Sequence, residues 1–121
     1  MTILYVDDDA DDAEIFCEAI HEIDPSINCT TFSHGNAIIA SDISRPDFLF
    51  LDFRMPILGG NEMLRQVKEN KSFVNTKIIM YSTVMSDQDM HECRQLGVHD
   101  CLKKSSGFDD LCNELRRVLI S

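Results

Sequence analysis

Acidic residues directly follow two short apolar runs, and their type and spacing suggest chemistry. Asp52 comes directly after the apolar run 48–51 (FLFL), and Asp7 and Asp8 come directly after the run 3–6 (ILYV). Runs this short, each stopped by an acid, indicate buried strands. If the two strands are parallel neighbours, their carboxylates meet at the carboxyl edge of one sheet, where open α/β sheets carry out chemistry. Clustered carboxylates repel one another, so this edge favours a hard cation.

The elements that must position these acids alternate along the chain. Apolar residues at helical spacing predict helices over 11–23 and around 36–40, 63–67, 89–96 and 108–118, and apolar runs predict strands at 3–6, 27–32, 48–51, 78–81 and 101–102. Ser86 with Asp89, and Ser106 with Asp109, resemble helix-capping pairs. Five strands that alternate with five helices require right-handed crossovers. We therefore predict a flavodoxin-like, doubly wound parallel sheet with strand order 2-1-3-4-5.

Size and composition restrict the classes of protein. The 121 residues are enough for one domain, and the sequence contains no predicted linker or output domain. A net charge of -10 argues against binding nucleic acid or an anionic membrane. No signal peptide or membrane span is visible, so we expect a cytoplasmic protein. The five cysteines form no C-x-x-C pair and are expected to be reduced thiols, most of them small core residues.

The predicted strand order places more polar groups at the same edge than a fold requires. Ser82 follows the fourth strand, and Lys103 and Lys104 follow the fifth. Together with the acids, this pattern resembles the receiver domain of bacterial response regulators over the whole chain, 1–121. The matching pieces are Val6-Asp7-Asp8, the string 51–56 (LDFRMP) with Gly60, Ser82 and Lys104.

The resemblance implies a phosphoryl-accepting signalling protein. In such a protein Asp52 receives the phosphoryl group from a phosphohistidine on a sensor histidine kinase or a histidine phosphotransfer protein. Asp7, Asp8, Asp52 and the backbone carbonyl of Arg54 would hold Mg²⁺. The signal would pass to another protein by contact or by onward transfer. Such a chain catalyses only its own phosphorylation and dephosphorylation.

Three further residues have roles that the resemblance implies. Lys104 would neutralise a phosphoryl oxygen, and Ser82 would move to donate a hydrogen bond to the attached group. The family's aromatic switch position is occupied here by Cys101, so the coupling between Ser82 and the output surface should not depend on a large ring. In the family a proline usually follows this lysine, whereas here Ser105 follows Lys104. We expect the Lys104–Ser105 peptide bond to be trans.

Other interpretations differ in identifiable residues. A pseudo-receiver, which binds partners without phosphorylation, would lack an acid or the lysine, whereas this chain keeps both. An EF-hand loop over 7–18 would need glycine where Asp12 stands. An aspartate-based phosphatase would need an acid where Arg54 stands. The remaining acids, Asp11 and Asp12, are explained by the preference of helix N-termini for negative charge.

Overall fold

A computed structural model gives the structure of the chain and describes residues 1–34, 37–38, 45–52, 60–83, 86–104 and 107–120. Its sheet has five parallel strands in the order β2-β1-β3-β4-β5, as predicted. The elements in chain order are β1 (Thr2–Val6), α1 (Ala10–Ile23), β2 (Asn28–Phe32), β3 (Phe48–Leu51), α3 (Gly60–Glu69), the 3₁₀ turn η1 (Lys71–Phe73), β4 (Lys77–Ser82), α4 (Asp87–Gln95), β5 (Asp100–Lys103) and α5 (Phe108–Leu119).

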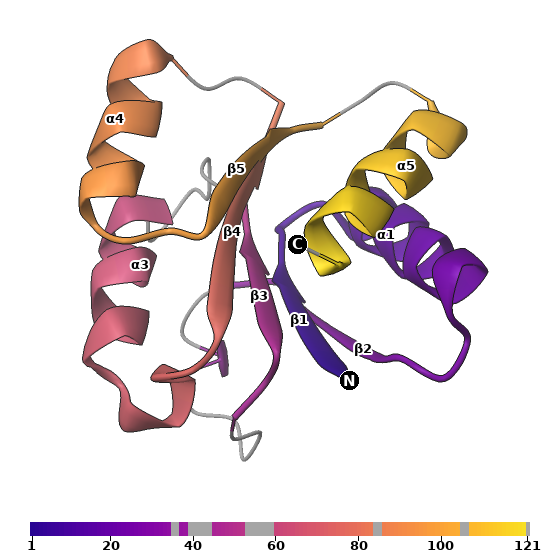
Figure 1. Cartoon of the computed structure of the whole chain (residues 1–121), viewed down its shortest axis with the longest axis horizontal. Coiled ribbons are helices and arrows are strands. Elements are labelled where there is room, and N and C mark those ends of the chain that lie inside the picture. Colours follow the sequence, from indigo (N-terminus) through magenta and orange to yellow (C-terminus); the bar gives the residue numbers. More distant parts are fainter. Residues whose placement is uncertain (35–36, 39–44, 53–59, 84–85, 105–106, 121) are drawn as a thin grey trace.

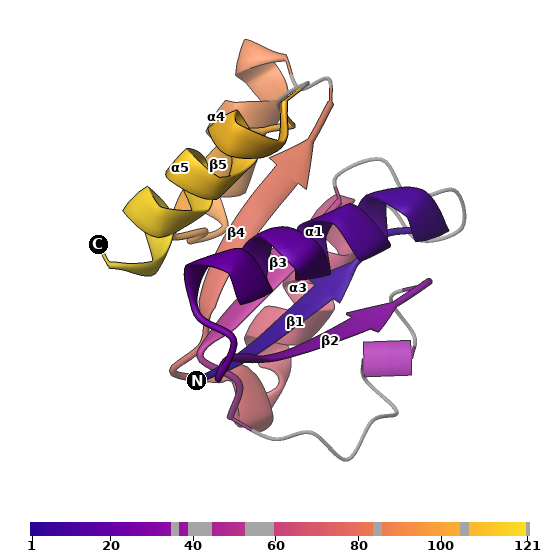
Figure 2. The ribbon, with the colours of Figure 1, turned by 90° about the vertical axis from the view of Figure 1, so that its right-hand side faces the viewer.

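Helices cover both faces of the sheet. Figure 1 shows α1 and α5 on one face and α3 and α4 on the other, and Figure 2 shows α1 lying across the strands. The predicted helix over 36–40 falls mostly outside the described residues, of which 37 and 38 are helical. Within the described part of the chain, no helix combines the length and the apolar character needed to cross a bilayer.

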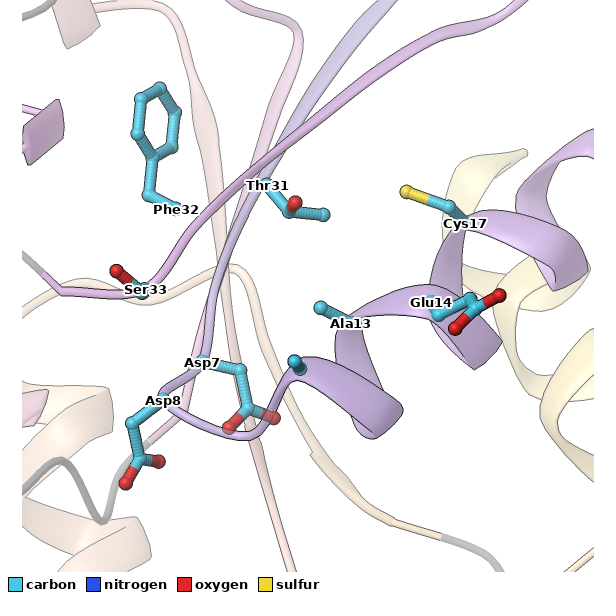
Figure 3. A pocket seen from close by; sticks show the side chains of 9 residues that line it. Asp7, Asp8, Ala13, Glu14, Cys17, Thr31, Phe32 and Ser33 are labelled. Atoms are coloured by element: carbon cyan, nitrogen blue, oxygen red, sulfur yellow. The ribbon is translucent and has the colours of Figure 1, made fainter.

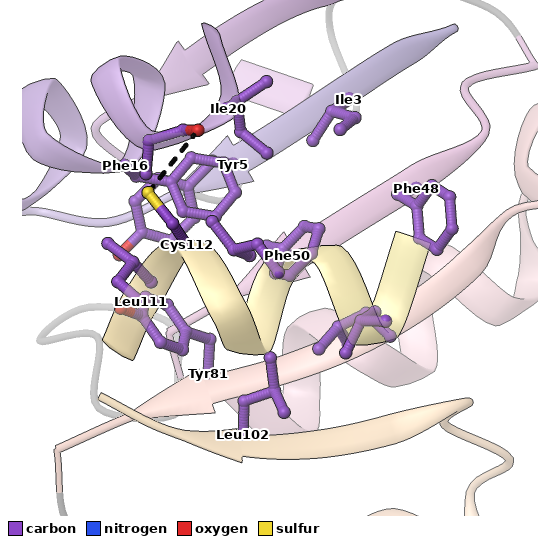
Figure 4. Packing of buried hydrophobic residues seen from close by; sticks show 14 of the residues in the cluster. Ile3, Tyr5, Phe16, Ile20, Phe48, Phe50, Tyr81, Leu102, Leu111 and Cys112 are labelled. Carbon is purple, nitrogen blue, oxygen red and sulfur yellow. Dashed lines mark hydrogen bonds between the residues drawn. The ribbon is translucent and has the colours of Figure 1, made fainter. Parts of the chain in front are cut away.

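Strand residues alternate between two apolar cores. Ile3 and Tyr5 point to the core under α1 and α5, whereas Leu4 and Val6 point to the core under α3. Figure 4 shows the first core, in which the rings of Tyr5 and Phe16 stack with centroids 4.2 Å apart. β1 and β3 are apolar on both faces because both faces are covered, which explains their continuous apolar runs.

Local signals define where the helices begin. Asp9 caps α1, and its carboxylate accepts hydrogen bonds from the backbone N–H groups of Asp11 and Asp12. The predicted capping box of Ser86 and Asp89 at α4 is confirmed. The predicted cap at Ser106 is wrong, because the N-cap of α5 is Gly107, which makes no side-chain cap.

Candidate functional site

The sheet places Asp7 and Asp52 side by side. Val6 pairs with Leu51 across β1 and β3, and the next backbone N–H, that of Asp52, donates to the Val6 carbonyl at 3.0 Å. The hydrogen-bond ladder therefore continues into the first residue after each strand. Asp7 is 2% exposed and Asp52 is 6% exposed, so two carboxylates are buried at adjacent strand ends.

Lys104 connects these two carboxylates. Its Nζ lies 2.7 Å from Asp7 Oδ2 and 3.1 Å from Asp52 Oδ2. The backbone N–H of Lys104 donates to the Ser82 carbonyl at 2.8 Å, which fixes the start of the side chain beside β4. Burial disfavours the ammonium, but its hydrogen bonds to the carboxylates outweigh this effect and raise the pKa of Lys104 above its usual value. The lysine is therefore charged at all physiological pH values.

Asp7 has further donors on both oxygens. The Tyr5 hydroxyl donates to Oδ2, and the backbone N–H of Asp9 donates to Oδ1 at 3.0 Å. Burial opposes ionisation of Asp7, but the hydrogen bonds from Lys104, Tyr5 and Asp9 prevail and lower its pKa. Burial and the adjacent carboxylate raise the pKa of Tyr5. Asp7 is thus held as a carboxylate by a neutral phenol and a charged ammonium.

Asp12 belongs to the same cluster, a contact that the sequence pattern did not predict. Its Oδ2 lies 3.0 Å from Lys104 Nζ, and its side chain is 41% exposed. The preference of a helix N-terminus for acids explains part of its placement, but the ion pair gives it a second contact. Tyr5 was missed as well. It stands two residues before Asp7 on the same side of β1, which is the signal that could have identified it.

The acidic cluster fits a hard divalent cation. Asp7, Asp8 and Asp52 each offer a carboxylate oxygen, and these oxygens all lie within 4.8 Å of one another. Oxygens that share one Mg²⁺ at about 2.1 Å lie about 3 Å apart in adjacent positions and about 4.2 Å apart in opposite ones. Figure 3 shows the Asp7 and Asp8 carboxylates together at one end of an open pocket. The expected fourth ligand, the Arg54 carbonyl, lies outside the described residues.

The other predicted residues lie at or near the ends of β4 and β5. Ser82, at the end of β4, is 1% exposed. Lys103 is exposed, so the lysine at the carboxylates is Lys104 and not its neighbour. Cys101 is half-buried and packs on the core beneath α3 and α4. The Lys104–Ser105 bond lies outside the described residues.

Comparison with known proteins identifies the kind of domain that carries this cluster. The family model described as the response regulator receiver domain matches residues 3–116. The DNA-binding transcriptional regulator NtrC of Salmonella typhimurium is 35% identical over 95 residues, which cover 77% of this chain and 20% of that protein. The phosphate regulon transcriptional regulatory protein PhoB of Pseudomonas aeruginosa is 26% identical over 98% of this chain and 51% of its own length. The chain therefore spans between a fifth and about half of these relatives.

Solved structures agree in fold. The phosphorylated cyanobacterial phytochrome response regulator RcpA superposes with a TM-score of 0.85 at 22% identity, covering 97% of this chain and 89% of its own. The chemotaxis response regulator CheY4 of Vibrio cholerae superposes with a TM-score of 0.82 at 24% identity, covering 97% of each chain. At these identities the likeness establishes the arrangement of strands and helices.

Proposed function

The chain belongs to the response regulator receiver domain family, and from this membership we propose that Asp52 accepts a phosphoryl group from a phosphohistidine on another protein. The observation that carries the proposal is the contact of a single partly buried ammonium, that of Lys104, with both Asp7 and Asp52. A structural ion pair needs one acid for one base. Here several carboxylates surround one lysine, and this excess of negative charge suits a site that holds a cation.

Transfer to Asp52 requires a nucleophilic carboxylate and neutralisation of phosphoryl charge. A carboxylate oxygen of Asp52 forms the new P–O bond while the P–N bond to the donor histidine breaks and the imidazole leaves. The ammonium of Lys104 lies within contact of Asp52 and is placed to pair with a phosphoryl oxygen. Asp7, Asp8 and Asp52, with the Arg54 carbonyl, would hold a Mg²⁺, which when bound would further neutralise the phosphoryl oxygens.

Ser82 is the residue proposed to detect the new group. It ends β4, the strand next to β3, and its hydroxyl can donate to a phosphoryl oxygen on Asp52. Movement of Ser82 would shift the segment that leads into α4. Cys101 occupies the switch position on β5, and its small side chain transmits less of that movement than an aromatic ring would.

The proposed partners are proteins. A sensor histidine kinase or a histidine phosphotransfer protein supplies the phosphoryl group, and a downstream protein receives the signal by contact or by onward transfer. The net charge of -10 supports a protein partner over a nucleic acid. We propose no substrate beyond the chain itself, whose chemistry is its own phosphorylation and dephosphorylation. A phosphorylation-independent pseudo-receiver is not favoured, because the acids and Lys104 are retained together at one site.

Labelling with a small acyl phosphate tests the proposal. Incubation with acetyl phosphate and Mg²⁺ should increase the intact mass by one phosphoryl group, and hydroxylamine should remove it because it cleaves acyl phosphates. The Asp52→Asn variant should remain unlabelled. Asp11→Asn is the matched control, since Asp11 is exposed in the first turn of α1 and does not belong to the cluster.

The possible outcomes distinguish phosphorylation of Asp52 from phosphorylation of another residue, from no phosphorylation and from an effect of overall charge. Labelling of Asp52→Asn equal to that of the unsubstituted chain would refute the choice of acceptor. Absence of labelling in the unsubstituted chain with both the acyl phosphate and a cognate kinase would favour the pseudo-receiver. Loss of labelling in Asp11→Asn would show that the effect is one of overall charge and not of position.

A further inference from the structure

Two cysteine sulfurs lie close together on the side of the molecule formed by α1 and β2. Cys17 is on α1, Cys29 is on the edge strand β2, and their Sγ atoms are 3.0 Å apart. Both are free thiols and both are half-buried. Neither residue belongs to the acidic cluster, and the proposed function does not use them.

The distance is close to that needed for a covalent bond. A disulfide has an S–S length of about 2.05 Å, so the two sulfurs must approach by only about 1 Å. The backbone around them is fixed on both sides, because Cys29 pairs with Ile3 in the sheet and α1 packs on the core beside β2. The fold therefore holds the two thiols together before any oxidation takes place.

One of the two thiols faces solvent through a pocket. Cys17 lines an open pocket of about 430 Å³ together with Ala13, Glu14 and Thr31, and the pocket extends to Asp7 and Asp8. Figure 3 shows the Cys17 sulfur directed into this space. Burial and the neighbouring thiol raise the pKa of Cys29, which makes Cys29 a poor first nucleophile. An oxidant that enters the pocket therefore meets Cys17 first.

We propose that Cys17 and Cys29 form an oxidative modification site at which hydrogen peroxide generates an intramolecular disulfide. With peroxide, the Cys17 sulfur attacks one peroxide oxygen, the O–O bond breaks, and Cys17 becomes a sulfenic acid with release of water. The Cys29 sulfur then attacks the Cys17 sulfur, the S–O bond breaks, and a second water leaves. Two thiols are oxidised by two electrons, and one peroxide is reduced to two waters.

The other cysteines are less suited to this reaction. Cys93 is fully buried and Cys112 is 3% exposed, so soluble oxidants reach neither. Cys93 and Cys101 lie near enough to affect one another, because Cys101 contributes to the raised pKa of Cys93 after the larger effect of burial. This second pair is the rival that the experiment has to distinguish.

Peptide mapping of the oxidised native protein tests the site. The folded chain is treated with limiting peroxide, its remaining thiols are alkylated after denaturation, and the products are digested with trypsin. The first lysine or arginine in the chain is Arg45, but Pro46 follows it and blocks tryptic cleavage, so Cys17 and Cys29 share the tryptic peptide 1–54. We expect this peptide to lose two hydrogens and to take up no alkylating reagent. Cleavage after Glu18 or Glu22 should leave two peptides joined by the disulfide.

Three variants separate the roles of the two sulfurs. Cys29→Ser removes the resolving thiol, so in excess peroxide Cys17 should proceed from sulfenic to sulfinic acid as a second peroxide is reduced to water. Cys17→Ser should leave Cys29 alkylated to the same extent with and without peroxide. Cys101→Ser is the matched control and should form the disulfide as the unsubstituted chain does. Closure of the loop between Cys17 and Cys29 should raise the Tm of the oxidised protein by roughly 5–10 °C.

Several results would overturn the proposal. Full alkylation of both Cys17 and Cys29 after peroxide treatment would show that the contact does not lead to a bond. A disulfide mapped to Cys93 and Cys101, or a covalent dimer on a non-reducing gel, would assign the oxidation elsewhere. Because the unsubstituted chain provides the primary result, failure of a variant to fold leaves the test intact. The readout is independent of phosphorylation, so failure of the proposed function would not affect it.

Discussion

Substitution of Asp8 tests whether the acidic cluster is strained in the absence of a cation. Asp8 is exposed, and a carboxylate oxygen of Asp8 lies within 4.8 Å of oxygens from both Asp7 and Asp52. Lys104 Nζ contacts Asp7, Asp12 and Asp52 but is a single positive charge. Asp8→Asn removes one negative charge and leaves the geometry of the loop nearly unchanged. We therefore expect the variant to be more stable than the unsubstituted chain when no divalent cation is present.

The magnitude follows from Coulomb's law. At the 4.8 Å limit, two unit charges repel by about 0.9 kcal/mol in a medium as polarisable as water. Asp8 has two such neighbours, and loss of its attraction to Lys104 offsets part of the gain. We expect the free energy of unfolding to rise by about 1 kcal/mol, which corresponds to roughly 3–5 °C in Tm for a chain of this size.

The assay is thermal unfolding in EDTA and in Mg²⁺. A site that binds Mg²⁺ in the folded state gains about 1.4 kcal/mol when the free cation is at ten times its Kd. The unsubstituted chain should therefore be more stable than Asp8→Asn in Mg²⁺, so the order of stabilities reverses between the two buffers. An Asp8→Asn variant that is less stable in EDTA, or that keeps the full response to Mg²⁺, would refute the reasoning. Asp11→Asn should show neither effect.

Four further predictions concern the same site. Lys104→Met should lower the free energy of unfolding by about 3–5 kcal/mol in urea titrations, because it leaves Asp7 and Asp52 buried without a counter-charge. Tyr5→Phe should lower it by about 1.5–3 kcal/mol, since it removes a hydrogen bond to a carboxylate. The pKa of Asp7 is lowered in the folded state, so the ionised side chain stabilises the fold fully at pH values above its ordinary pKa of about 3.9. This stabilisation is lost as the pH falls through the folded-state pKa of Asp7. Asp7→Asn should therefore reduce the fall in the free energy of unfolding at acid pH. Ser82→Ala should abolish the phosphorylation-dependent changes in backbone NMR shifts of α4.

Matched substitutions serve as controls for these variants. Tyr81→Phe removes a second hydroxyl from the same core, but it leaves the hydrogen bond from Tyr5 to Asp7 in place, so its effect should be smaller than that of Tyr5→Phe. Cys101→Ala should retain most of the NMR response that Ser82→Ala loses. If Cys101→Ala removes the response completely, the cysteine acts as a switch in spite of its size. If Tyr5→Phe and Tyr81→Phe are equally destabilising, the contact with Asp7 contributes no more than ordinary packing.

The strand order and the position of the acids were predictable because they depend on short-range patterns. An apolar run that ends in an acid fixes both a strand and the edge at which the acid lies, as for Asp7 and Asp52. Helix ends with paired signals, such as Ser86 and Asp89, were predictable for the same reason. Gly107 was not predicted as an N-cap, because glycine offers no side-chain acceptor that would mark it.

Two contacts between distant segments, both involving α1, were not predictable from one sequence. The ion pair of Asp12 and Lys104 joins residues 92 positions apart, and it depends on how the first turn of α1 is oriented over the sheet. The contact of Cys17 with Cys29 depends on the rotation of α1 against β2. Hydrophobic periodicity identifies the buried face of a helix, but it does not determine which two polar or sulfur atoms meet across an interface.

The two tyrosines make this site optically visible. The chain has two tyrosines and no tryptophan. The Tyr5 hydroxyl donates to Asp7, and Lys104 Nζ lies 5.5 Å from the centroid of the Tyr81 ring. Burial raises the pKa of Tyr81 to about 12, so its ring is a neutral phenol at neutral pH. When the protein is excited at wavelengths that tyrosine absorbs and phenylalanine does not, its emission therefore comes from two rings beside the acidic cluster, and a change of charge there can be followed by intrinsic fluorescence without a dye.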